Sequence, residues 1–188
     1  MQFISKKFII CFILIATGIS VNAQTLTAKK LTVTPDVKIG KLPNGLTYYI
    51  RKNEEPKDRA ELRLVVKAGS VLETEQQAGL AHFIEHMAFN GTKNFEKQEL
   101  VNFLEKSGVN FGADLNAYTS FDETVFMLQL PTDSPAVFKK GFQILEDWAH
   151  NVSFDTTEID KERGVVIEEW RSGQGQANVS GLKLFRFF

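Results

Sequence analysis

The pattern of apolar and polar residues predicts two strands early in the chain. The pair Asn44-Gly45 is a strong tight-turn signal, and the run from Leu46 to Arg51 that follows it is typical of a strand. The stretch RAELRLVVKAG then alternates between polar and apolar residues and ends at Gly69, which predicts a second strand. Residues 24–41, in front of both strands, are interpreted as an extended lead-in.

Farther along the chain, the spacing of apolar residues predicts two helices followed by two strands. The first helix covers GLAHFIEHMAFNGT (79–92), and the second covers about Lys97–Lys106. The segment FGADLNAYTSFDETVFMLQLP (111–131) is typical of two strands that meet near residues 120–123.

Two more helices are marked by their capping residues. One has Asp133 or Ser134 as its cap and Pro135 in its first turn. The other opens at Asp155–Glu158, which resembles a capping box, and runs to about Trp170. The resulting order of elements predicts an α+β fold, with helices packed on one face of a mostly antiparallel sheet.

The composition allows one globular domain and argues against one class of partner. With 188 residues, 43% of them hydrophobic, the chain can bury a core of ordinary size. Its formal net charge is −1, and no run of Lys and Arg occurs. Because binding to phosphates needs a clustered basic surface, we expect no nucleic-acid partner.

The first 23 residues have the pattern of a secretory signal peptide. Lys6 and Lys7 precede an apolar run from Phe8 to Ile19, and small residues at Val21 and Ala23 predict cleavage after Ala23. The apolar run has about 12 residues, short of the roughly 20 that a membrane span needs. We therefore expect a cleaved leader, no membrane span in the mature chain, and a periplasmic or secreted location.

Two of the three histidines lie in the helix predicted over residues 79–92. His82 and His86 are one helical turn apart, so both imidazoles can reach one metal ion, with Glu85 beside it. That carboxylate can take a proton from a metal-bound water and deliver it to a leaving amine. Alternatively, the histidines pack into a core and Glu85 faces solvent. Burying all three on one face without a cation would be costly, which favours the metal site.

A catalytic zinc usually takes three protein ligands, and the last predicted helix offers candidates for the third. Glu162 and Glu169 lie two turns apart on one face, whereas Glu168 falls in line with a polar stripe. Glu169 lies closer to the apolar residues Val165 and Val166. We therefore predict Glu169 as the third ligand, in preference to Glu168, and Glu162 as a residue that orients a ligand.

The segment GSVLETEQQAGLAHFIEHMAFNGT, with its inverted H-x-x-E-H motif, resembles the active-site signature of the pitrilysin/insulinase family of zinc metallopeptidases. LPNGLTYYI is similar to the family's opening strand, NFGADLNAYTSFDETVFML to its following strands, and IDKERGVVIEEW to the helix with its distal glutamate. The resemblance spans about Leu42 to Ser172. It implies the half-clamshell domain of the pitrilysin/mitochondrial processing peptidase type.

The resemblance also implies roles for individual residues. A single Zn²⁺ would be held by His82, His86 and Glu169, with Glu85 as the catalytic base and Glu162 as an assisting glutamate. The substrate would be a peptide or an unfolded protein segment that adds as a strand to the sheet edge at Gly112–Thr119. The residues nearest its scissile bond would be Asn116, Ala117 and Tyr118.

Members of this family build a clamshell from an N-terminal half and a homologous C-terminal half. We therefore expect a second half or a partner subunit, and a truncated chain: signal peptide (1–23), lead-in (24–41), incomplete peptidase domain (42–176) and divergent tail (177–188). The predicted function is that of a zinc metalloendopeptidase. The alternative is a non-catalytic member, or an inert zinc-binding fragment, that binds peptides or supports a partner subunit.

Overall fold

The computed structural model describes residues 32–109, 112 and 115–180. The predicted signal peptide and residues 181–188 of the predicted tail lie outside the described residues. The chain forms two compact units that divide between Lys52 and Asn53, and each is described by itself.

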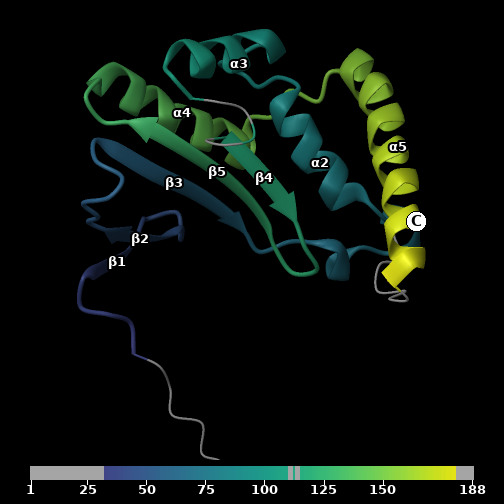
Figure 1. The fold of residues 1–188 in the computed structure, drawn as a ribbon, viewed down its shortest axis with the longest axis horizontal. Helices are drawn as coiled ribbons and strands as arrows, with labels where there is room; N and C mark the ends of the chain where they lie inside the picture. Colours follow the sequence, from purple (N-terminus) through teal and green to yellow (C-terminus); the bar gives the residue numbers. More distant parts are fainter. Residues whose placement is uncertain (1–31, 110–111, 113–114, 181–188) are drawn as a thin grey trace, which may run out of the picture. The chain divides into compact units, whose positions relative to one another are not determined.

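The first unit is a β-hairpin. Strand β1 (Val37–Lys41) pairs antiparallel with β2 (Thr47–Arg51), from Val37 opposite Arg51 to Lys41 opposite Thr47 (Figure 1). The predicted turn lies between them, with Gly45 at a φ of 94° that favours glycine. Strand β1 lies within the segment 24–41, which the sequence predicts only as an extended lead-in. Its two apolar residues are too few to mark a strand, and pairing with β2 defines it.

The second unit contains a three-stranded antiparallel sheet with the order β3-β5-β4 (Figure 1). Its strands are β3 (Arg59–Val66), β4 (Leu115–Thr119) and β5 (Thr124–Pro131). Its α-helices are α2 (Leu80–Phe89), α3 (Lys97–Lys106), α4 (Pro135–His150) and α5 (Thr156–Ser180). Two short 3₁₀ turns, η1 (Ser70–Leu72) and η2 (Glu75–Gln77), lead from β3 to α2.

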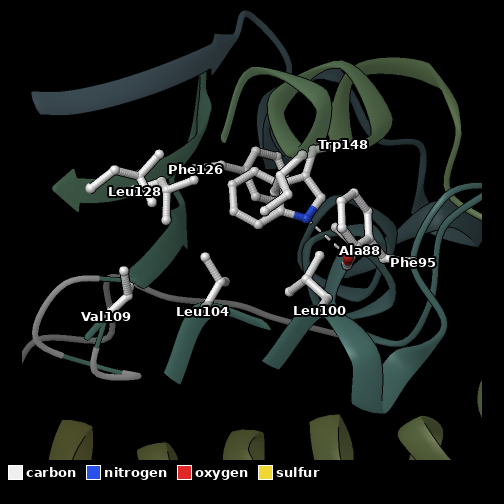
Figure 2. Packing of buried hydrophobic residues seen from close by; sticks show 10 residues of the cluster. Ala88, Phe95, Leu100, Leu104, Val109, Phe126, Leu128 and Trp148 are labelled. Atoms are coloured by element: carbon white, nitrogen blue, oxygen red, sulfur yellow. Dashed lines mark hydrogen bonds between the residues drawn. The ribbon is translucent and has the colours of Figure 1, made fainter. Parts of the chain in front are cut away.

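The core lies between one face of this sheet and the helices. Phe126 and Leu128 of β5 are buried against Leu100 and Leu104 of α3 and against Trp148 of α4 (Figure 2). The residues of β3 that point to the other face of the sheet are exposed. The predicted α+β fold, an antiparallel sheet with helices on one face, is therefore confirmed.

Two details depend on close packing and helix length. A Cβ at Gly141 would overlap the side chain of Leu130, so glycine lets α4 approach β5 closely. Helix α5 continues past the predicted end at Trp170 to Ser180, so residues 177–180 of the predicted tail are helical. Within the described residues, none of the helices combines the length and the apolar character needed to cross a membrane.

Asp147 of α4 binds the segment that follows α2 through hydrogen bonds. Its side chain is fully buried and accepts hydrogen bonds from Thr92 Oγ1 (2.7 Å), Asn151 Nδ2 (3.0 Å), and the backbone and side-chain amides of Asn94 (3.1 and 2.7 Å). Burial by itself raises the pKa of a carboxyl group, but the hydrogen bonds together hold the pKa of Asp147 below its ordinary value. The ionised carboxylate therefore stabilises the fold.

Replacing Asp147 with Asn should lower the free energy of unfolding at pH 7 by about 3 kcal/mol, because charge-assisted hydrogen bonds are lost in a buried position. Since the pKa of Asp147 is lower in the folded state, its contribution is present above about pH 4 and is lost as the pH falls further. Urea denaturation at neutral and acidic pH measures both effects. If the difference in unfolding free energy between the wild type and Asp147→Asn stays constant down to about pH 3, this role is contradicted.

Candidate metal centre

Helix α2 is fixed at both ends. At its start, Gly79 has the left-handed φ of 81°, and the carboxylate of Glu73 accepts hydrogen bonds from the backbone N–H groups of Gly79 (2.8 Å) and Ala81 (2.7 Å). At its end, Trp148 Nε1 donates to the carbonyl of Ala88 at 3.0 Å. The histidine-bearing helix is thus held by a cap from the preceding loop and by a buried bond from α4.

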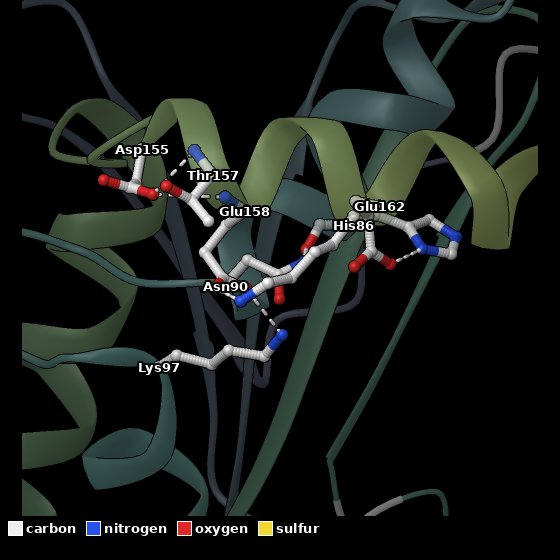
Figure 3. A network of polar contacts seen from close by, with 8 residues as sticks. His86, Asn90, Lys97, Asp155, Thr157, Glu158 and Glu162 are labelled. Carbon is white, nitrogen blue, oxygen red and sulfur yellow. Dashed lines mark hydrogen bonds and ion pairs between the residues drawn. The ribbon is translucent and has the colours of Figure 1, made fainter.

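Helix α5 is capped by Asp155 and linked to α3 by an ion-paired glutamate. Asp155 Oδ1 accepts from the backbone N–H groups of Thr157 (2.9 Å) and Glu158 (3.1 Å), as Figure 3 shows. Glu158 in turn pairs with Lys161 (2.6 Å) and with Lys97 of α3 (2.8 Å). The hydrogen bonds from Lys161 and Lys97 lower the pKa of Glu158, so the pairing persists at neutral pH.

Three side chains from α2 and α5 converge on one point. His82 Nε2 lies 3.1 Å from His86 Nε2, and Glu169 Oε2 lies 3.2 Å from His86 Nε2 and 3.6 Å from His82 Nε2. The structure thus brings together the three residues that the sequence predicts as ligands. Such atoms repel one another at this range unless a proton or a cation lies between them.

The donor set fits a zinc ion. In a tetrahedral site with ligand bonds of 2.0–2.2 Å, two donor atoms lie about 3.3–3.6 Å apart, close to the separations found here. Two imidazole nitrogens and one carboxylate oxygen are also the ligand types of many catalytic zinc sites, which keep a fourth position open.

Glu162 contacts the far side of one imidazole. Its Oε1 lies 2.8 Å from His86 Nδ1, and the two side chains are only 13% and 16% exposed (Figure 3). An ionised carboxylate only accepts hydrogen bonds, so Nδ1–H donates here and the Nε2 lone pair is directed toward His82 and Glu169. Such a contact would orient the imidazole of His86; the role of Glu162 toward a metal ligand stays a prediction from the sequence.

Glu85 is the buried member of the motif. It is 8% exposed, and its Oε2 accepts a hydrogen bond of 2.5 Å from Thr119 Oγ1 at the end of β4. Glu168, the rejected candidate, pairs instead with Arg171, and its side chain is 67% exposed. The structure therefore separates Glu168 from the two histidines.

The three residues predicted to meet a substrate lie on β4, an edge of the sheet. Ala117 packs against the core, whereas Asn116 and Tyr118 are exposed. The hydroxyl of Tyr118 donates to Glu123 Oε1 at 2.7 Å, and this bond raises the pKa of Tyr118. Contact with an added strand would therefore run mainly through the backbone of β4.

Sequence reasoning missed Glu73 and Thr119. Glu73 precedes the helix by a loop that contains η2, so no capping spacing marks it. Thr119 lies far from Glu85 in the chain, and only the packing of β4 against α2 brings them together. The sequence signal for Glu73 is weak, and Thr119 has no local signal.

The domain combines an antiparallel sheet covered by helices with an inverted H-x-x-E-H motif, and a distal glutamate lies beside the two histidines of that motif. Together these features define a domain of the zinc metallopeptidase type. The chain belongs to the insulinase family (peptidase family M16), whose model matches residues 48–180.

Similar proteins agree with this assignment. The chain is 42% identical over 167 residues to the probable zinc protease PqqL of Haemophilus influenzae, covering 88% of this chain and 18% of that protein. It is 43% identical over 142 residues to the zinc protease PQQL-like of Arabidopsis thaliana, covering 76% and 14%. The crystal structure of the first half of the periplasmic protease PqqL from Escherichia coli matches with a TM-score of 0.73 and 41% identity, covering 77% and 31%. The chain thus spans 18% and 14% of the length of these two curated relatives.

The contacts of Glu73 lead to a testable prediction. Glu73→Ala should lower the free energy of unfolding by about 1 kcal/mol, because two N–H groups at the start of α2 lose their acceptor. It should also weaken zinc binding, since the first turn of α2 carries His82. Thermal unfolding and zinc titration measure these effects, with Glu75→Ala as the matched control. Equal behaviour of the two variants would contradict the capping role.

Proposed function

We propose that this chain carries the zinc-binding and catalytic groups of a metalloendopeptidase that hydrolyses peptides or unfolded protein segments. The observation that supports this most directly is the convergence of His82, His86 and Glu169, with Glu85 of the same motif buried on helix α2. The insulinase-family match and the zinc protease relatives support the same class of reaction.

In the proposed mechanism, His82, His86 and Glu169 hold a single Zn²⁺, and Glu162 orients His86. Bound zinc would supply a Lewis acid that polarises a carbonyl and makes water more acidic. Glu85 acts as the general base: it takes a proton from the attacking water and passes it to the amine that leaves as the peptide bond breaks.

The substrate is proposed to bind as an additional strand at the free edge of β4. In the sheet order β3-β5-β4, the described residues provide no partner on that side of β4. Backbone hydrogen bonds would align the peptide, which favours broad specificity. Asn116, Ala117 and Tyr118 are the residues that we assign to this contact.

We further propose the division of the chain predicted from its sequence, with a signal peptide over residues 1–23 and an incomplete peptidase domain over 42–176. The periplasmic location of the Escherichia coli PqqL protease supports a periplasmic or secreted location here. Because that crystal structure is only the first half of the protease, turnover is proposed to need a homologous C-terminal half or a partner subunit.

The role of Glu85 as the general base is tested with the mature chain, both alone and with the C-terminal half of a PqqL relative added. The wild type should bind one zinc per chain, and His82→Ala should not bind zinc stoichiometrically. Glu85→Gln should keep the metal but cleave a quenched peptide about 10²–10⁴-fold more slowly, because the proton acceptor is lost. Wild-type protein without stoichiometric zinc would exclude the site. Metal binding without turnover, even with the added half, would favour the alternative of a peptide-binding or supporting module.

The third ligand is tested by replacing Glu162, Glu168 and Glu169 singly with Gln. Zinc affinity should fall most for Glu169→Gln, and about 10–100-fold for Glu162→Gln, which only loosens His86. Glu168→Gln is the matched control and should bind zinc as the wild type does, since Glu168 pairs with Arg171. Competition with a chromophoric chelator gives the affinities. A larger loss for Glu168→Gln than for Glu169→Gln would reverse the assignment.

A further inference from the structure

The carboxylate of Glu85 has one partner in the sheet. Thr119 Oγ1 donates to its Oε2 at 2.5 Å. Glu85 is 8% exposed, so few waters can replace this hydroxyl if it is removed. A buried carboxylate without a hydrogen-bond donor is costly, and the bond to Thr119 therefore selects one orientation of the side chain.

The direction of this bond follows from the chemistry of the two groups. An ionised carboxylate only accepts, so the hydroxyl of Thr119 must donate. Among the hydrogen bonds of the described residues, Oε2 is the oxygen of Glu85 that is engaged, and Oε1 is left to accept a proton. Oε2 thus fixes the orientation of the side chain, and Oε1 is the oxygen that accepts the proton.

The place of Thr119 in the fold gives this bond a second consequence. Thr119 ends β4, the strand whose free edge is proposed to bind the peptide backbone, and it is paired with Thr124 of β5. One rigid strand would then set both the register of the peptide and the position of the base. Small errors of alignment, of about 1 Å, can cost a reaction about 10²-fold in rate.

We propose that Thr119 is a positioning residue for the catalytic base: its hydroxyl holds the carboxylate of Glu85 in the orientation that accepts a proton from water. This inference rests on the proposed function. It assigns no metal contact to Thr119, so removal of the hydroxyl leaves the three zinc ligands in place.

The test compares Thr119→Val, which removes the hydroxyl at nearly constant size, with Thr119→Ser, which keeps it. Both are assayed with the C-terminal half present. Thr119→Val should lower kcat about 10–100-fold, with KM and zinc stoichiometry unchanged, and Thr119→Ser should restore most of the loss. A structural role alone would lower folded protein and zinc content and would leave kcat per zinc-loaded molecule unchanged.

Thr124→Val is the matched control. Thr124 faces Thr119 in the strand pairing, with their hydroxyl oxygens 3.5 Å apart, and is 7% exposed. Its hydroxyl donates to the carbonyl of Ala68 at 2.9 Å, away from Glu85. This variant should lose stability like Thr119→Val but keep its kcat. An equal fall in kcat for both valine variants would overturn the specific role of Thr119.

A second measurement does not depend on turnover. Unfolding of Thr119→Val, Glu85→Ala and the double variant forms a double-mutant cycle, and the losses should not add, because each single change breaks the same bond. An additive cycle would overturn the inference, as would unchanged kcat in Thr119→Val beside an inactive Glu85→Gln. A Glu85→Gln variant that still cleaves at the wild-type rate contradicts the proposed function instead, whatever the cycle shows.

Discussion

The hydrogen bond between His86 and Glu162 is the contact on which the candidate metal centre depends. The proposed ligands come from two helices, so the site exists only if α2 and α5 keep a fixed separation. With side chains only 16% and 13% exposed, this 2.8 Å bond is shielded from water. The bond joins the two helices and also selects the tautomer of His86. The same contact therefore fixes the distance between α2 and α5 and leaves Nε2 of His86 as the nitrogen with a free lone pair.

The other contacts around the centre hold α2 against its surroundings, each from a different direction. Glu73 binds the first turn, Trp148 of α4 binds the carbonyl of Ala88, and Thr119 of β4 binds Glu85. None of these residues is a proposed ligand. The sheet and α4 therefore fix the motif as a rigid body, and only α5 remains to complete the set of donors.

The sequence predicts the relations within each helix and, together with the family resemblance, the distal glutamates, but it misses contacts such as Thr119–Glu85 that only packing creates. Helical spacing alone places His82, Glu85 and His86 together, and the amphipathic face of the last helix separates Glu169 from Glu168. The range of α3 is also predicted correctly, because its apolar spacing and the glycine just past its end, Gly108, are local signals. Strand β1 is missed because pairing with β2, rather than its own residues, defines it.

The two sides of the metal centre differ in how firmly they are held. His86 is 16% exposed and has Glu162 behind it, whereas the side chain of Glu169 is 51% exposed and, among the described residues, its carboxylate meets only the two histidines. If these three side chains bind a cation, as proposed, the ion would join α5 to α2 in addition to the His86–Glu162 bond. Metal affinity and the position of α5 would then be linked: contacts that hold α5 in place would strengthen binding, and binding would in turn stabilise the helix in that position.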